Sequence, residues 1–147
     1  MDVLEATHAD IPSLCSLLEL LFSQEIEFSP SLEKQKKGLE LILNNEQIGK
    51  ILVLKHDEQV IGMVSLLFSI STALGGKVAW LEDMIVHPDF RGQACGSQLL
   101  TYAIKEAKAL TCKRITLLTD RDNTVAHRFY ERLGFKGSSM QPFKILL

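Results

Sequence analysis

The sequence lacks the features that mark secreted or membrane proteins. Its three cysteines, Cys15, Cys95 and Cys112, are odd in number and widely spaced, so they form neither a disulfide framework nor a Cys-x-x-Cys pair. No apolar run approaches the roughly 18 residues of a membrane-spanning helix. Residues 1–5 are acidic, unlike the basic start of a signal peptide. These absences predict a protein of a reducing, cytoplasmic compartment with no membrane partner.

The charged residues and the histidines give no sign of a nucleic-acid partner or of a metal site. The chain has 16 basic and 18 acidic residues and no run of Lys or Arg, which argues against a nucleic-acid partner. The histidines His8, His56, His87 and His127 are scattered and form no constellation with Asp or Cys. We therefore expect no metal site.

The common nucleotide-binding and nucleophile motifs are absent too. Neither G-x-x-x-x-G-K-[ST] nor G-x-G-x-x-G occurs, and no G-x-S-x-G elbow is present. Instead, residues 91–96 read Arg-Gly-Gln-Ala-Cys-Gly, between a strand-like run and a strongly helical one. A tight loop of small residues before a helix directs backbone amides and the positive end of the helix dipole at an anion. The loop predicts a cradle for the pyrophosphate of a nucleotide-bearing cofactor.

Length and hydrophobic patterning predict one α/β domain over residues 1–147. With 46% hydrophobic residues, the chain can bury a sizeable core. Apolar periodicity and turn residues predict the following elements: strand 3–7, a helix capped by Asp10, a helix starting at Ser29 and Pro30, strands 50–55, 60–71 and 78–86, helix 97–110, strand 114–119, helix 124–133 and a final strand 143–147.

Two motifs in this order resemble those of the GNAT family of N-acetyltransferases. The first is Arg-x-x-Ala-x-Gly at residues 91–96, which resembles the family's acyl-CoA motif. The second runs from Asn123 to Phe135 and resembles N-x-x-A-x-x-F-Y-x-x-x-G-F. The resemblance covers residues 78–135 strongly and the N-terminal half by layout. It implies the GNAT fold, a mixed and mostly antiparallel sheet of six to seven strands with about four helices, in the order β-α-α-β-β-β-α-β-α-β.

The resemblance also implies acetyl-CoA as cosubstrate. Amides of the loop would face the pyrophosphate, and amides at the end of strand 78–86 would bond the pantetheine arm and polarise the thioester. Alanine at position 94 departs from the commoner glycine, so the loop is either right-handed there or mildly strained. The expected cofactor-binding residues are Ile85, Val86, Arg91, Gly92, Gln93, Ala94, Cys95, Gly96, Ser97, Asn123 and Tyr130.

Two residues are expected to move protons. Tyr130 follows Asn123 by seven residues, as the family's proton-donating tyrosine does, although it also suits an aromatic anchor beside Phe129. The stretch Leu-Glu-Asp at 81–83 resembles the diamine acetyltransferase branch, which makes Glu82 the candidate general base. Alternation sends Glu82 and Asp83 to opposite faces of a central strand that would bury both carboxylates. Substrate binding by Glu82 stays an alternative, and Asp83 is expected to be structural.

The predicted function is transfer of an acetyl group from acetyl-CoA to a primary amine, most simply that of a small molecule, by direct attack through a tetrahedral intermediate. Alternatives are a protein N-terminal or lysine acetyltransferase and a CoA-binding regulatory module without turnover. A homodimer is a candidate assembly because members of the family often dimerise.

Overall fold

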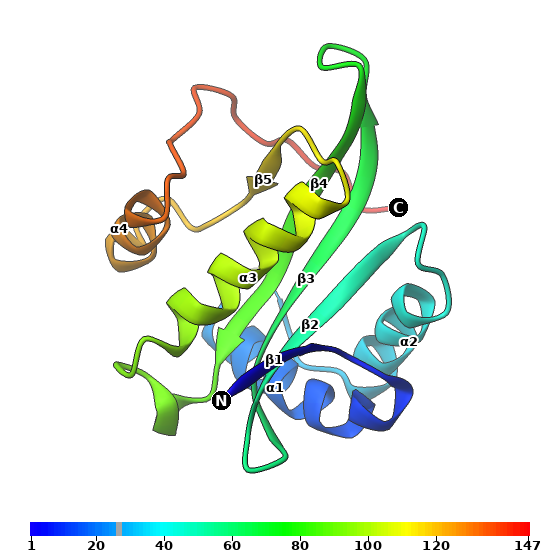
Figure 1. The fold of residues 1–147 in the computed structure, drawn as a ribbon, viewed down its shortest axis with the longest axis vertical. Coiled ribbons are helices and arrows are strands. Elements are labelled where there is room, and N and C mark those ends of the chain that lie inside the picture. Colours follow the sequence, from blue (N-terminus) through cyan, green and yellow to red (C-terminus); the bar gives the residue numbers. More distant parts are fainter. Residues whose placement is uncertain (26–27) are drawn as a thin grey trace.

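The computed structural model describes residues 1–25 and 28–147 as a five-stranded sheet with helices on both faces (Figure 1). The strands are β1 (Asp2–Glu5), β2 (Gly49–His56), β3 (Gln59–Ser71), β4 (Gly76–Val86) and β5 (Ile115–Leu117). The helices are α1 (Ile11–Gln24), α2 (Leu32–Leu43), α3 (Cys95–Ala109) and α4 (Thr124–Arg132), with short 3-10 turns η1 (His8–Asp10) and η2 (Pro88–Phe90).

The strands lie side by side in chain order. The first four pair antiparallel, whereas β5 runs parallel to β4. Helix α3 makes the crossover that a parallel pair requires. Between β2 and β3, Asp57 and Glu58 have φ values of 48° and 66°. Positive φ at both central residues makes the two-residue turn that matches strand twist. The predicted mixed, mostly antiparallel sheet with four helices is confirmed.

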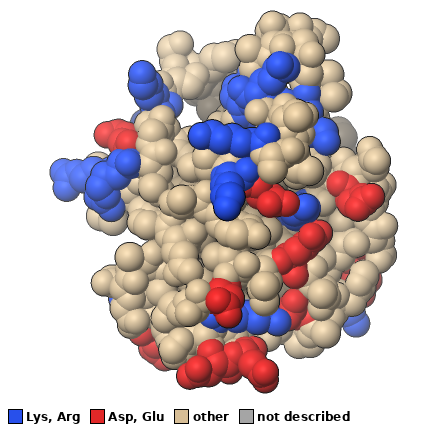
Figure 2. Space-filling model, in the orientation of Figure 1, with Lys and Arg blue, Asp and Glu red and all other residues tan. Residues whose placement is uncertain are grey.

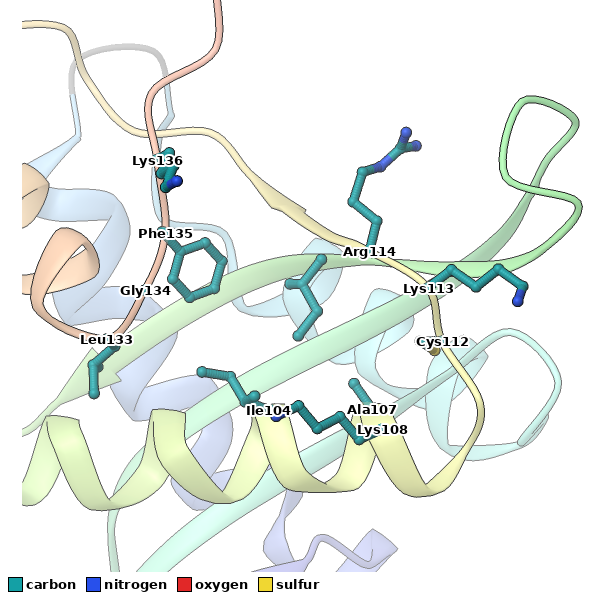
Figure 3. A pocket seen from close by; sticks show the side chains of 11 residues that line it. Ile104, Ala107, Lys108, Cys112, Lys113, Arg114, Leu133, Gly134, Phe135 and Lys136 are labelled. Carbon is teal, nitrogen blue, oxygen red and sulfur yellow. The ribbon is translucent and has the colours of Figure 1, made fainter.

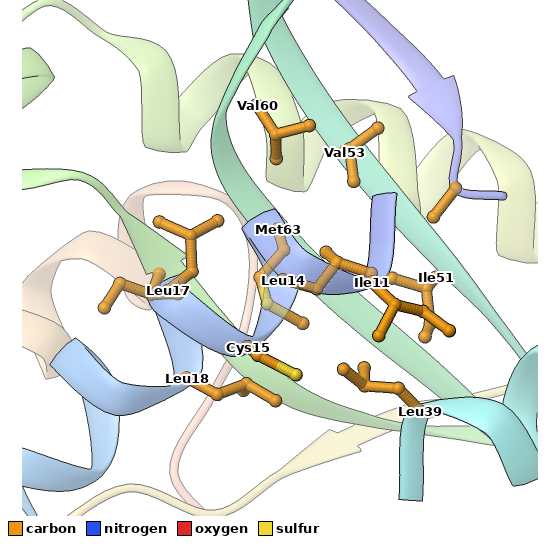
Figure 4. Close-up of a cluster of buried hydrophobic side chains, with 12 residues drawn as sticks. Ile11, Leu14, Cys15, Leu17, Leu18, Leu39, Ile51, Val53, Val60 and Met63 are labelled. Atoms are coloured by element: carbon orange, nitrogen blue, oxygen red, sulfur yellow. The ribbon is translucent and has the colours of Figure 1, made fainter. Parts of the chain in front are cut away.

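The sheet separates two apolar layers. Helices α1 and α2 cover one face, shown in Figure 4, and α3 and α4 pack on the other. Helix α1 follows Asp10 and carries Pro12 in its first turn, as predicted. The first layer is built from Ile11, Leu14, Leu17, Leu18, Leu39, Ile51, Val53 and Met63. The second layer contains Leu52, Leu54, Val64, Leu66, Leu81, Leu99, Leu100 and Ala103.

Three predicted features of the fold were wrong. The sheet of the described chain has five strands, not six or seven, because residues 143–147 form no strand. Phe143 and Ile145 are 90% and 82% exposed, so this segment lacks the partner strand and apolar contact that a strand needs. Helix α2 begins at Leu32, since the hydroxyl of Ser31, not of Ser29, accepts the hydrogen bond of the Lys34 amide.

Candidate active site

The C-terminal half of β4 has a neighbour on only one side. The ladder between β4 and β5 ends at the pair Leu81 and Leu117, while pairing with β3 continues to Val86. Residues 82–86 therefore face a gap on the β5 side, within the part of the chain that the structure describes. A gap between splayed strands exposes main-chain donors and acceptors that a ligand can bind.

Strand alternation shows which amide faces this gap. The His87 amide donates to the carbonyl of Ile61 at 2.7 Å, so the main-chain groups of His87 point towards β3. Those of Val86 point the opposite way because neighbouring residues alternate, and the Arg91 Nε donates to the Val86 carbonyl from that side at 3.4 Å. Of the two predicted polarising amides, Val86 faces the gap, whereas Ile85 faces β3.

The predicted loop leads from η2 into α3. Among the described residues, no protein group accepts a hydrogen bond from the amides of residues 92–97. Gly92 and Ala94 have φ values of +77° and +60°, so both are left-handed. Of the two conformations expected for Ala94, the structure has the strained, left-handed one. This conformation costs about 1 kcal/mol of folding free energy. The loop and the first turn of α3 present six unbonded N–H groups.

Two loop residues fix the start of α3 by packing. Cys95 is buried, and its Sγ lies 3.5 Å from the Sδ of Met1, which makes it a small apolar plug. A Cβ on Gly96 would come within 3.3 Å of the Phe129 ring of α4. Glycine at position 96 therefore lets α3 and α4 approach closely, beside the gap that follows Leu81 of β4.

A β-bulge interrupts β4 at Asp83. Ser65 of β3 lies opposite Glu82, but Met63 lies opposite Ile85, so β4 has one extra residue between these pairs. Asp83 occupies the bulge with φ of +54°. Non-glycine residues with positive φ cost energy and gather at functional sites. The sequence did not predict this bulge, because Leu-Glu-Asp reads as regular strand.

Glu82 lies on the α1 face of the sheet. Val64 and Leu66 both pack in the α3 layer, so Ser65 between them, and Glu82 opposite, face the other way. Glu82 is exposed and Asp83 is partly buried. The expectation that the strand buries both carboxylates is therefore wrong for Glu82.

Asp83 and Tyr130 share an electrostatic environment. Burial, with smaller effects from Glu82 and Glu25, raises the pKa of Asp83 from 3.8 to about 6. Burial, followed by the charge of Glu25, also raises the pKa of Tyr130. The charge of Glu25, the C-cap residue of α1, thus acts on both side chains. A phenol with a raised pKa stays protonated at neutral pH and is able to donate a proton.

The second motif forms the loop and helix that carry Tyr130. The Asn123 Oδ1 accepts a hydrogen bond from the Ala126 amide at 3.1 Å and caps α4. The Tyr130 ring lies 5.3 Å from the ring of Phe129 and 5.8 Å from that of Phe135. Asn123 thus caps α4 through its Oδ1, and the expected contact with the cofactor would use its Nδ2.

Sequence reasoning missed Glu25 and Ser65. The Ser65 side chain is fully buried, and its hydroxyl has no hydrogen-bond partner among the described residues. Its signal was a serine within the apolar run 60–68 of β3, but only the register with β4 places it beside Glu82. Glu25 gave no signal, because its electrostatic effect on Tyr130 depends on the tertiary fold. Each of the two adds a polar group near the bulge.

The described chain offers neither a metal site nor a membrane-spanning helix. No group of three His, Cys, Asp or Glu side chains could hold a metal ion within the described residues. Nor is any described helix both long enough and apolar enough to cross a membrane. His87 turns its Nδ1 to the Asp89 amide at 3.2 Å and caps η2.

The gap, the loop and the second motif define an acyltransferase class, and the comparison with protein families agrees. The family model described as "Acetyltransferase (GNAT) family" matches residues 13–135. The chain belongs to this family and is an acetyltransferase by class.

Individual relatives support this placement. The aminoalkylphosphonate N-acetyltransferase of Salmonella typhimurium is 31% identical, over 99% of this chain and 94% of that protein. The structure of glucosamine-6-phosphate N-acetyltransferase from Arabidopsis thaliana matches with a TM-score of 0.77 at 22% identity, over 98% and 97% of the two chains. A structure described as a transcriptional regulator from Bacillus halodurans matches at 27% identity and a TM-score of 0.83, over 99% of each chain.

Proposed function

We propose that the protein transfers an acetyl group from acetyl-CoA to a primary amine of a small molecule, by direct attack through a tetrahedral intermediate. The observation that carries this proposal is the row of unbonded amides at residues 92–97, next to the unpaired side of β4. The row suits a pyrophosphate, and the gap suits an extended pantetheine arm.

With the exception of Ile85, whose amide faces β3, the residues expected to hold acetyl-CoA keep their roles in this proposal. Arg91 and the amides from Gly92 to Ser97 would bind the pyrophosphate, and Asn123 would bond the arm through its Nδ2. The Val86 amide would donate to the thioester oxygen, where negative charge develops during attack. Because this amide is part of a strand, it is oriented before the substrate arrives.

Proton transfer completes the reaction. Tyr130 would give its hydroxyl proton to the departing thiolate of CoA, whose conjugate thiol has a pKa of about 8.5. Glu82 would take a proton from the attacking ammonium group through a water molecule. Attack forms the C–N bond, and collapse of the intermediate breaks the C–S bond, so the products are an amide and CoA thiol.

Asp83 is a second candidate for the base, on one specific observation. Its pKa of about 6 lies closer to neutral pH than that of an ordinary carboxyl, as a general base requires. Rate measurements from pH 5 to 9 on Glu82→Gln and Asp83→Asn separate the two. We expect Glu82→Gln to lower kcat/KM at every pH, and Asp83→Asn to leave kcat/KM and its acidic limb in place. Loss of that limb only in Asp83→Asn would transfer the role to Asp83.

The acceptor is proposed to be a small amine. Two named relatives act, by their names, on an aminoalkylphosphonate and on glucosamine 6-phosphate, both amines with an anionic group. The acidic residues Glu25, Glu82 and Asp83 suit the ammonium end of such a molecule. The cysteines are free, which fits the proposed cytoplasmic setting.

A thiol-release assay tests the function. Acetyl-CoA is incubated with the protein and a panel of aminoalkylphosphonates, amino sugars, amino acids, diamines and lysine peptides. Thiol release that depends on a small amine is the expected result. Release only with peptides would favour a protein acetyltransferase, and tight CoA binding without release from any amine would favour a regulatory module.

A further inference from the structure

Ser65 of β3 carries a buried hydroxyl group to which no described residue bonds. The residue is 0% exposed, and its Oγ has no hydrogen-bond partner in the part of the chain that the structure describes. A buried hydroxyl without a partner loses its hydrogen bonds to water and destabilises the fold. Alanine fills nearly the same space without this penalty. The serine therefore points to a partner that reaches the hydroxyl in another state of the enzyme.

The register of the sheet supplies one candidate partner, the carboxylate of Glu82. Ser65 and Glu82 lie directly opposite each other in the antiparallel pair of β3 and β4, and both side chains point to the α1 face. The Cβ atoms of opposite residues are about 4.5–5.5 Å apart, a separation that a glutamate side chain can cross to reach a serine hydroxyl. In the structure Glu82 is exposed instead, and the Ser65 hydroxyl is unbonded.

The other face of the sheet does not suit an amine. An apolar hollow of about 430 Å³ lies there, between α3 and β5, and is shown in Figure 3. Basic side chains such as Lys113 and Arg114 surround it, and Figure 2 shows Lys and Arg gathered over the same upper half of the molecule. Positive charge repels an ammonium group, and the hollow contains neither Ser65 nor Glu82. The amine is therefore expected on the face that carries the Glu82 carboxylate.

We propose that Ser65 is a positioning residue for Glu82: when the amine binds, the Glu82 carboxylate turns inward and accepts a hydrogen bond from the Ser65 hydroxyl. This inference rests on the proposed function, in which Glu82 takes a proton from the ammonium group through a water molecule. One carboxylate oxygen accepts from Ser65, and the other stays available to that water. The hydrogen bond thus fixes the carboxylate at the end of the proton path, and Ser65 itself transfers no proton.

Ser65→Ala tests the proposal through opposite changes in stability and rate. Removal of an unpartnered hydroxyl should raise the melting temperature by about 3 °C, because the resting enzyme has no hydrogen bond to lose. The same substitution should lower kcat about tenfold, as for one hydrogen bond to a charged group, with the KM for acetyl-CoA unchanged. Ser69→Ala is the matched control, because Ser69 lies on the same strand but is exposed and opposite Val78. The control should change neither quantity.

A double-mutant cycle then shows whether Ser65 acts through Glu82. Ser65→Ala added to Glu82→Gln should not lower the residual kcat further, because glutamine cannot take the proton. The proposal is overturned, with the proposed function left intact, by an unchanged kcat in Ser65→Ala, by a lower melting temperature, or by an equal tenfold loss in both backgrounds. If the natural protein releases no thiol with any amine, the proposed function fails and this inference fails with it.

Discussion

The two halves of strand β4 differ, although they are continuous in sequence. Residues 76–81 pair with β3 on one side, and residues 79–81 also pair with β5 on the other. Val78, Ala79 and Leu81 are buried. Residues 82–86 carry a bulge, a left-handed Asp83 and an unpaired side. Buried apolar side chains and two partner strands stabilise the first half. The second half has no partner strand on its β5 side. We attribute structure to the first half and ligand chemistry to the second.

Tyr130→Phe should have the largest effect on kcat. It tests the ligand chemistry that we attribute to the second half of β4. It removes the proposed donor but keeps the ring contacts with Phe129 and Phe135. We expect kcat to fall roughly 10²-fold or more, with little change in melting temperature. Steady-state rates under saturating amine check this. An unchanged kcat would remove Tyr130 from the chemistry and leave it as an aromatic anchor.

Leu81→Ala tests the first half of β4. Leu81 is 3% exposed in the α3 layer, so its truncation leaves a cavity and should lower the free energy of unfolding by about 3 kcal/mol. Urea denaturation measures the loss. The fraction that is still folded should keep the kcat of the natural enzyme, and a stable variant with lost kcat would contradict the division of β4 into two roles.

Asp83→Asn should stabilise the protein above pH 7 and not at pH 4. The folded carboxyl has a pKa of about 6, above the unfolded value of 3.8, so folding binds a proton between these pH values. The natural protein therefore loses stability as pH rises from about 4 to 6, and a neutral amide avoids that loss. We expect a gain of about 3 kcal/mol at pH 8. Equal gains at both pH values would mean that Asp83 carries no buried charge.

Ala94→Gly should have the smallest effect. Glycine adopts the left-handed conformation without a Cβ penalty, so stability should rise by about 0.5–1 kcal/mol while the affinity for CoA changes little. Gly92→Ala is the matched control, because φ is +77° and a Cβ there meets no atom within 4 Å. Thermal unfolding should show opposite shifts for the two variants. Shifts of the same sign would contradict backbone strain as the cause.

Much of the fold could be predicted from sequence because it depends on local patterns. The hairpin around Asp57 and Glu58 and the start of α1 beside Asp10 follow from turn and capping residues. The bulge at Asp83 depends on the register with β3, which periodicity does not encode. The last strand could not be predicted correctly, since residues 143–147 have strand composition but pair with no described strand.

The candidate site shows the same limit. The motifs located the loop and Tyr130, but the left-handed conformation of Ala94 required the structure. The choice of Val86 over Ile85 as the amide that faces the gap required the strand pairing. Interactions between distant segments, such as the effect of the Glu25 charge on the pKa of Tyr130, arise only from the tertiary fold.

Backbone amide NMR during titration with CoA tests the central claim most directly. If the unbonded amides grip the diphosphate, the largest proton shifts should fall at residues 92–97, with a smaller one at Val86 where the arm enters the gap. Saturable binding that leaves these signals in place and moves distant ones would contradict the account, as would the absence of any binding.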